Sequence, residues 1–367
     1  MNLSLLRGAA ARAGLAMACV WAAGLAAAAP APAGTDAVLS GRAQPAARPE
    51  RAMLMGIARA GDRLVAVGEH GVVALSDNHG RDWRLAAEVP ADVTLTAVRF
   101  ANARRGWAIG HLGLVLRTDD GGDRWVKQLD GLSIAKIAQA QTDPPVAPDA
   151  ARRLVEEGPD KPLLDLLVQD PQQVTVIGAY NLALATSNGG QAWRLVSEQF
   201  DNPGHMHLYG LAATPAGRVA VGEQGLVLRE QADRLKALKS PYDGSLFGLL
   251  ASGDTLLVFG LRGNAFVSRD GGASWKASLL PGSGASINAG LRLSDGRLLL
   301  VDQAGGAFVS ADGGERFERL PFAWGAPLTG VVEAADGTLV GSSLAGITRL
   351  PRPAAAHAAA AGTGASR

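Results

Sequence analysis

Cysteine is almost absent from this 367-residue sequence, and neither sign of charge is in excess. The single cysteine is Cys19, and 35 lysines and arginines face 34 aspartates and glutamates, which leaves a net charge of +1. Without pairs of cysteines, the fold must be held by its apolar core rather than by disulfides. Without a basic excess to displace phosphate counterions, the chain is not expected to bind nucleic acid.

Catalytic signatures are also missing. The sequence contains no G-x-S-x-G, H-E-x-x-H or P-loop motif, and no pair of carboxylates is identifiable by spacing as an acid and a base. His205 and His207 have the spacing of a metal-binding pair, but no third ligand at a suitable spacing is evident. We therefore expect no catalytic residues, no metal and no small-molecule cofactor.

Long hydrophobic runs are limited to one, at the N-terminus. Residues 13–29 carry no charge, follow Arg7 and Arg12, and lead into a series of small residues. This pattern is typical of a secretory signal peptide, which we place at residues 1–29. The alternative is a transmembrane anchor, but the run is short and rich in alanine. The sequence thus predicts export to the periplasm, or secretion, and removal of Cys19 with the signal.

Glycine, in contrast, is abundant, with 47 residues, which indicates many tight turns and an all-β protein. An eight-residue motif, here called the eight-residue box, occurs at 76–83, 118–125, 186–193, 268–275 and 310–317. In every copy the final aromatic residue follows an anchor position by 15 residues; the anchors are Gly68, Gly110, Gly178, Gly260 and Asp302. Five equal intervals identify a true repeat.

Two weaker copies complete the series. Gly222 opens one whose turn at 230–237 has lost the box, and Gly341 opens another that fades near residue 350. Successive anchors lie 42, 68, 44, 38, 42 and 39 residues apart, and a period near 40 is that of a four-stranded propeller blade. The sequence therefore predicts a seven-bladed β-propeller of four-stranded blades over residues 53–350. The long interval places an insertion at 133–163, between blades two and three.

The strands of a blade can be read directly from the repeat. In blade two we expect strands at 95–100, 106–110, 114–118 and 125–128, which we call A to D from first to last. The last blade has only three, at 328–333, 338–341 and 345–350. We expect residues 37–40, within the N-terminal segment 30–52, to supply its fourth strand and close the ring. Residues 351–367 are expected to form a disordered tail.

The eight-residue box has the composition of a structural turn. Its third residue is Asn78, Asp120, Asn188, Asp270 or Asp312, whose side-chain oxygen can bond neighbouring backbone amides. Its eighth is Trp83, Trp125, Trp193, Trp275 or Phe317, which can pin the turn against the blade. The alternative is a calcium loop at 119–123, but the twelfth-position glutamate is missing and the box also occurs with asparagine.

The opposite face of the propeller carries what is unusual in this sequence. The boxes are turns between strands C and D, whereas the turns between B and C and the links between blades lie on the other face. That face receives the insertion, with a helix expected at 148–157, and the link at 198–207. Insertions on one face of a repeat protein usually mark its binding face. We expect partner-binding residues there, namely His70, His111, Tyr180, Asn181, His205, His207 and Arg262.

Simpler explanations remain open for some of these residues. Tyr180 can instead pack against the insertion, and His207 can bond within its own blade. Arg99 and Arg292, on A strands, either bind an acidic partner in the central channel or form a solvated ring.

The repeat resembles that of a known group of proteins. The box is similar to the Asp-box, or BNR repeat, and the run from Val98 to Trp125, with Gly106-Trp107-Ala108 and Asp120-Gly121-Gly122, resembles the repeat of photosystem II assembly and stability factors. The resemblance covers about residues 53–350. It implies a non-catalytic propeller that docks to a membrane protein or membrane complex facing the periplasm, and we expect it to act as a monomer.

Other secreted proteins with this box suggest an alternative function as a glycoside hydrolase or glycan binder of the sialidase type. The resemblance to sialidases is incomplete. Only three tyrosines are available, the nearest strings to the Arg-Ile-Pro element, at 319–321 and 349–351, come late in the chain, and seven repeats do not match six blades.

Overall fold

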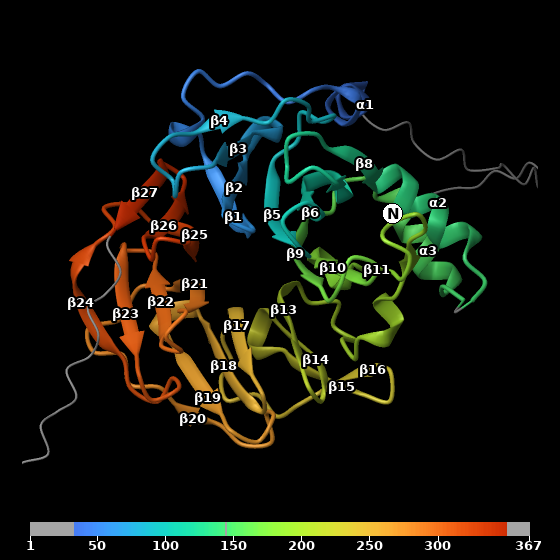
Figure 1. Ribbon diagram of the computed structural model, residues 1–367. Helices are drawn as coiled ribbons and strands as arrows, with labels where there is room; N and C mark the ends of the chain where they lie inside the picture. Colours follow the sequence, from blue (N-terminus) through green and yellow to red (C-terminus); the bar gives the residue numbers. More distant parts are fainter. Residues whose placement is uncertain (1–32, 144, 351–367) are drawn as a thin grey trace, which may run out of the picture.

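The computed structural model describes residues 33–143 and 145–350 (Figure 1). The predicted signal peptide at 1–29 and the predicted disordered tail at 351–367 lie outside these residues. Among the helices within them, none has the length and apolar character needed to cross a membrane.

Seven antiparallel sheets surround a central axis as the blades of a propeller (Figure 1). Blades one to three are β1 (Leu54–Ala60), β2 (Arg63–Gly68), β3 (Val73–Ser76) and β4 (Arg84–Leu85); β5 (Leu95–Phe100), β6 (Gly106–Gly110), β7 (Val115–Thr118) and β8 (Val126–Leu129); and β9 (Leu163–Val168), β10 (Val174–Gly178), β11 (Ala183–Thr186) and β12 (Arg194–Leu195). Blades four and five are β13 (Leu208–Thr214), β14 (Gly217–Gly222), β15 (Val227–Gln231) and β16 (Arg234–Ala237); and β17 (Leu246–Ser252), β18 (Thr255–Gly260), β19 (Ala265–Ser268) and β20 (Lys276–Ala277). Blade six is β21 (Ile287–Arg292), β22 (Leu298–Asp302), β23 (Gly306–Ser310) and β24 (Glu318–Ala323), and blade seven is β25 (Leu328–Glu333), β26 (Leu339–Ser343) and β27 (Gly346–Leu350).

The predicted seven-bladed, all-β propeller is therefore confirmed. Each sheet follows chain order from its A strand to its last strand, and the A strands lie innermost (Figure 1). Apolar clusters fill the space between adjacent blades, such as the one that joins Val65 and Leu75 of blade one to Leu95 and Leu116 of blade two. Burial between blades thus holds the ring without disulfides.

The prediction that residues 37–40 close blade seven as a strand is wrong. These residues end the helix α1 (Ala33–Ser40), and the seventh sheet has three strands. Leu39 is buried against the apolar cluster between blades one and two, and the Leu39 carbonyl accepts a hydrogen bond from Lys127 Nζ at 2.9 Å. Residues 37–40 are thus fixed where blades one and two meet, and they do not pair with blade seven.

The ring closes through direct contacts between blades seven and one. Thr329 Oγ1 donates to the Leu54 carbonyl at 2.7 Å, and Arg349 Nε donates to the His79 carbonyl at 3.0 Å. Val332 and Val340 share an apolar cluster with residues of blade one. The short helix η1 (Pro49–Arg51) lies against β27, on the side where a fourth strand was expected.

The anchor positions of the repeat mark a close approach of backbone to backbone. A Cβ at Gly68 would lie 1.9 Å from the Met53 carbonyl oxygen, and a Cβ at Gly110 would lie 2.4 Å from that of Thr94. Strand pairing also corrects one anchor: Leu328 pairs with Ser343, as Leu54 pairs with Gly68, so the seventh anchor is Ser343 rather than Gly341.

The eight-residue boxes form the turns between strands C and D, and their side chains satisfy the turn backbone. In blade two, Thr118 Oγ1 accepts from Gly122 N at 3.0 Å, Asp120 Oδ1 accepts from Arg124 N at 2.9 Å, and Trp125 Nε1 donates to the Gly122 carbonyl at 2.8 Å. Equivalent bonds to the first and third residues recur in the other four boxes. The aspartate or asparagine is therefore occupied within its own turn.

Blade four shows how the same turn is made without the box. Glu230 stands where the five blades with a box have serine or threonine, and its carboxylate accepts from Arg218 N at 2.8 Å and from Arg218 Nε at 3.0 Å. The two residues at the tip, Ala232 and Asp233, both have positive φ, 48° and 66°, as a tight two-residue hairpin requires. An ion pair thus replaces the hydroxyl of the box.

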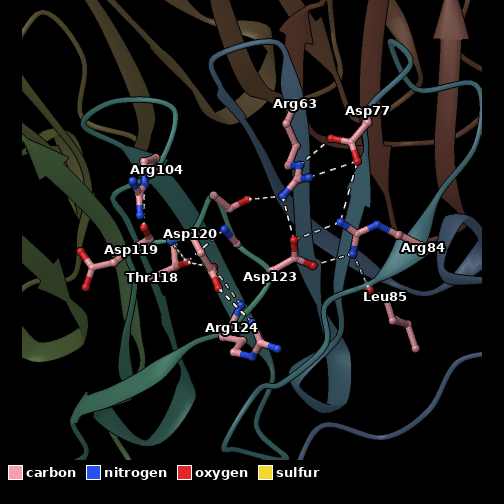
Figure 2. Close-up of polar contacts among 12 residues, drawn as sticks. Arg63, Asp77, Arg84, Leu85, Arg104, Thr118, Asp119, Asp120, Asp123 and Arg124 are labelled. Atoms are coloured by element: carbon pink, nitrogen blue, oxygen red, sulfur yellow. Dashed lines mark hydrogen bonds and ion pairs between the residues drawn. The ribbon is translucent and has the colours of Figure 1, made fainter.

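Arginines join each box to its neighbour on this face of the ring. Arg63 binds both oxygens of Asp77 and also donates to Asp123 of the next blade, which in turn accepts from Arg84 (Figure 2). The hydrogen bond from Arg84 and attraction to Arg63 lower the pKa of Asp123. Arginines on other blades donate in the same way to a box carbonyl of the next blade; these are Arg117, Arg229 and Arg269. The charges of the box face are thus largely paired within the protein.

The insertion between blades two and three folds as two helices, α2 (Gly131–Ala140) and α3 (Pro148–Glu156). The second agrees with the helix expected at 148–157, whereas the first was not foreseen. The pair lies outside the ring beside blades two and three (Figure 1). Gln141, just after α2, donates to the Leu195 carbonyl and accepts from Leu195 N, at 3.0 and 2.7 Å, which satisfies the open edge of β12.

Candidate functional site

The turns between strands B and C share an unusual backbone. Five of them are short 3-10 turns, η2 (Glu69–Gly71), η3 (His111–Gly113), η4 (Ala179–Asn181), η6 (Glu223–Gly225) and η7 (Leu261–Gly263), and the middle residue of each has φ between 51° and 59°. Non-glycine residues adopt this conformation infrequently. The middle residues are His70, Leu112, Tyr180, Gln224 and Arg262. All but Leu112 are exposed, so this face presents a set of side chains to solvent.

A cleft of about 790 Å³ opens on this face between α3 and the link that joins blades three and four. Leu182, Leu195 and Phe200 form apolar parts of its wall, and each is nearly fully buried. Tyr180 stands on its margin with 58% of its surface exposed, one of the most exposed large apolar side chains among the described residues. The insertion thus forms one wall of a concave surface beside blade three.

Lys161 fixes the side of the cleft beneath Tyr180. Only 7% of this lysine is exposed, and Nζ contacts Glu157 Oε2 at 2.6 Å, Asp160 Oδ1 at 3.1 Å and the Tyr180 ring at 5.8 Å from its centroid. Burial alone lowers the pKa of the ammonium group, but the bonds to the two carboxylates outweigh burial and raise it. Lys161 is therefore a fixed, charged support for the tyrosine ring.

A buried amide pair holds the opposite side. Asn181 occupies the position where the other 3-10 turns have glycine, with φ 63°, and its Oδ1 accepts from Asn202 Nδ2 at 3.0 Å. Asn202 also bonds the backbone of Met206 through both side-chain atoms. The link at 198–207 is thus fastened to the Tyr180 turn, and Asn181 acts by positioning this link.

An aromatic series connects the cleft to the centre of the ring. The Tyr180 and His207 rings lie 4.7 Å apart, His207 and Tyr209 6.2 Å, and Tyr209 and Phe247 5.6 Å, all edge to face. Tyr180 N donates to His207 Nδ1 at 3.2 Å, which fixes the imidazole. The cleft is thereby linked to the channel by rigid, apolar contacts.

The central channel, of about 780 Å³, is lined by all seven A strands. Each A strand is bulged near its start, and the extra residues line the channel; they are Met55, Thr96, Leu164, Tyr209, Phe247, Asn288 and Thr329. Asp165 sits beyond the bulge, where its neighbours have glycine or alanine. Burial raises the pKa of this carboxyl, against the attraction of Arg99 at 3.3 Å and a hydrogen bond from Leu211 N at 3.0 Å.

The structure brings together four of the seven predicted partner-binding residues. Tyr180, Asn181 and His205 line the cleft, and His207 packs against Tyr180. His70, His111 and Arg262 lie on the B–C turns of other blades, outside the cleft, and His70 Nδ1 contacts Asp92 Oδ1 at 2.8 Å. Arg99 and Arg292 both line the channel, where Arg99 pairs with Asp165 and Arg292 bonds Ser252.

Several residues of the cleft escaped sequence analysis. Lys161 and Phe200 are 39 positions apart in the sequence and have no shared motif, so only the fold brings them together. The available signal was the unusual length of the two segments that carry them. Over the described parts of the chain, no group of three or more histidine, cysteine, aspartate and glutamate residues is arranged to hold a metal ion.

The fold is similar to those of several solved propellers. YCF48 bound to D1 peptide has a TM-score of 0.62 and 16% identity, with 83% of this chain and 95% of that chain covered. YCF48 from Cyanidioschyzon merolae has a TM-score of 0.61 and 14% identity, with 85% and 98% covered. Streptogramin B lyase has a TM-score of 0.62 and 12% identity, with 83% and 94% covered. At such identities these likenesses show the propeller fold alone. The sequence matches no protein-family model and no curated protein.

Proposed function

We propose that this protein is an exported, non-catalytic propeller that docks onto a membrane-protein partner and assists assembly of its complex, in the manner of a photosystem II assembly factor. The cleft beside Tyr180 is the docking site. The observation that carries the proposal is an exposed aromatic side chain, held in a strained backbone conformation over a buried lysine, at the margin of an apolar cleft. Aromatic residues fixed in this way are typical of binding hot spots.

Two further observations support this proposal. The box face uses its polar atoms in its own turns and in pairs with adjacent blades, so specialised features concentrate on the opposite face. One protein of the same fold is described with a bound peptide, YCF48 with D1 peptide, which shows that a propeller of this kind can hold a chain segment. Catalysis is not required by any of these features.

Capture of the partner tests the proposal. Tagged protein would be purified from detergent-solubilised membranes of its native host, in parallel with Tyr180→Ala and Val126→Ala. Val126 is a matched control because it is 63% exposed but lies on β8, away from the cleft. We expect one membrane protein to co-purify with the parent and with Val126→Ala and to be lost with Tyr180→Ala. Equal recovery with all three forms, or no recovery with any, would contradict docking through the cleft.

A further inference from the structure

The charge of the cleft specifies what it binds. Five carboxylates line it, from Asp149, Glu157, Asp160, Glu198 and Asp201, against three cations, from Arg153, Lys161 and Arg234. The lining thus has two more carboxylates than lysine and arginine side chains. Since the whole chain is nearly neutral, with a net charge of +1, this acidic character is local to the cleft.

The cationic side chains of the cleft differ in the bonds that they already make within the protein. Lys161 is held between Glu157 and Asp160 and is nearly buried. Arg234 Nη2 donates to the Glu198 carbonyl at 2.7 Å rather than to its carboxylate. Glu198 is exposed, and within residues 33–143 and 145–350 its carboxylate forms no ion pair. Within the described part of the chain, the Asp201 carboxylate accepts one long hydrogen bond, of 3.4 Å from Ala237 N. The same cleft is therefore lined by two carboxylates with few bonds inside the protein and by an exposed tyrosine.

An exposed aromatic ring together with carboxylates is an arrangement that recognises cationic side chains. A guanidinium or ammonium group gains from the ring face and from a charge-assisted hydrogen bond to a carboxylate. The apolar wall of Leu182, Leu195 and Phe200 suits a neighbouring apolar side chain. The cleft volume is in the range of sites that hold a small ligand or a short chain segment.

We propose that the cleft binds a linear cationic segment of the partner protein, in which an arginine or lysine stands beside an apolar residue. This inference rests on the proposed docking function and specifies the chemistry of the segment. An acidic segment would meet an excess of carboxylates and is disfavoured at this position.

Three matched peptides test the charge. They have the sequences GSGRFRGSG, GSGQFQGSG and GSGEFEGSG, each labelled at the N-terminus, and binding is measured by fluorescence anisotropy at 20 and 200 mM salt. We expect the arginine peptide to bind most tightly, with an affinity that falls as salt is raised, and the glutamate peptide to bind most weakly. Equal or tighter binding of the glutamate peptide, or binding of none of the three, would overturn the proposal.

Two variants of opposite charge sharpen the test. Glu198→Gln combined with Asp201→Asn removes the free carboxylates while preserving shape, and we expect the arginine peptide to bind about three- to tenfold more weakly. Arg153→Gln removes a lining cation that forms no ion pair with another described residue, and it should strengthen binding by up to about fivefold. Changes of the same sign in both variants would count against charge recognition.

The same variants separate this inference from the docking function. If Glu198→Gln/Asp201→Asn captures the membrane partner as the parent does while Tyr180→Ala loses it, docking stands and the cationic segment is rejected. If Tyr180→Ala also captures the partner normally, the docking site itself is rejected.

Discussion

The two faces of this propeller are built from the same repeat but use their polar groups differently. On the box face, hydroxyls and carboxylates bond the turn that carries them, and arginines bond the turn of the adjacent blade (Figure 2). On the opposite face, residues in a left-handed conformation present their side chains to solvent, and an insertion adds a cleft. The repeated residues thus maintain the ring, whereas the residues that depart from the repeat form the face on which we propose that the partner binds.

The largest expected effect is loss of a box aromatic. Trp125 is 2% exposed, lies in the cluster between blades one and two, and bonds its own turn. Trp125→Ala should lower the free energy of unfolding by about 3–5 kcal/mol, measured by urea denaturation. Tyr180→Ala, on the other face, should change it by less than about 1 kcal/mol because the side chain is exposed. Similar decreases in the free energy of unfolding for both variants would contradict the different roles of the two faces.

The second-largest loss of stability is expected on removal of a bond that closes the ring between blades seven and one. Arg349→Gln removes the bond from blade seven to the His79 carbonyl, and we expect a loss of about 1–2 kcal/mol in the free energy of unfolding. Arg124→Gln is the control, because Arg124 is mostly exposed and its ion pair with Asp120 is 3.9 Å long. If the two variants are equally stable, closure does not depend on this bond.

The contribution of Asp165, the buried carboxyl of the channel, to the free energy of unfolding should change with pH in one direction. Its pKa is raised in the folded state, chiefly by burial, so its contribution to stability is greatest at low pH and declines as pH rises through the folded pKa. The free energy of unfolding of the parent minus that of Asp165→Asn should therefore be larger at pH 3 than at pH 7. A difference that grows with pH would show that Arg99 outweighs burial.

The contribution of Asp270, a carboxylate of the eight-residue box in blade five, should change with pH in the opposite direction. Hydrogen bonds from the Ser274 side chain and backbone and from Ser268 lower the pKa of Asp270 to about 2. Its contribution is present above the unfolded pKa near 4 and is lost as pH falls towards 2. The stability difference between the parent and Asp270→Asn should thus shrink between pH 5 and pH 2 in urea titrations. A stability difference that stays constant from pH 5 to pH 2 would contradict a lowered pKa of Asp270.

The fold could be predicted from the sequence because each copy of the repeat encodes the turns and strands of one blade. Glycine anchors such as Gly68 are required wherever two backbone segments come too close for a Cβ, so their spacing reports the blades. In blade seven Ser343 occupies the anchor position instead of glycine. A search for glycine therefore selects Gly341, and only the strand pairing identifies the correct residue. The four residues 37–40 form part of a helix, because so short an apolar segment has no period that distinguishes helix from strand.

The cleft was only partly predictable for a different reason. Asn181 stands out because the equivalent position of the other four 3-10 turns is glycine, and His205 lies in the link at 198–207, outside the repeated segments. Lys161 and Phe200 contribute through contacts between segments that are distant in the sequence, and such contacts leave no spacing signal. The helix α2 begins with a capping box of Asp130 and Ser133, a pattern less distinctive than the usual one that ends in glutamate.

Site-specific cross-linking tests most directly the claim that binding belongs to one face. Because residues 20–367 contain no cysteine, Tyr180→Cys and Val126→Cys each introduce the one thiol of this part of the chain for a photoreactive maleimide. With native membranes, the account predicts a cross-link to one membrane protein from position 180 and none from position 126. Cross-linking of that protein from position 126 with none from position 180 would contradict it.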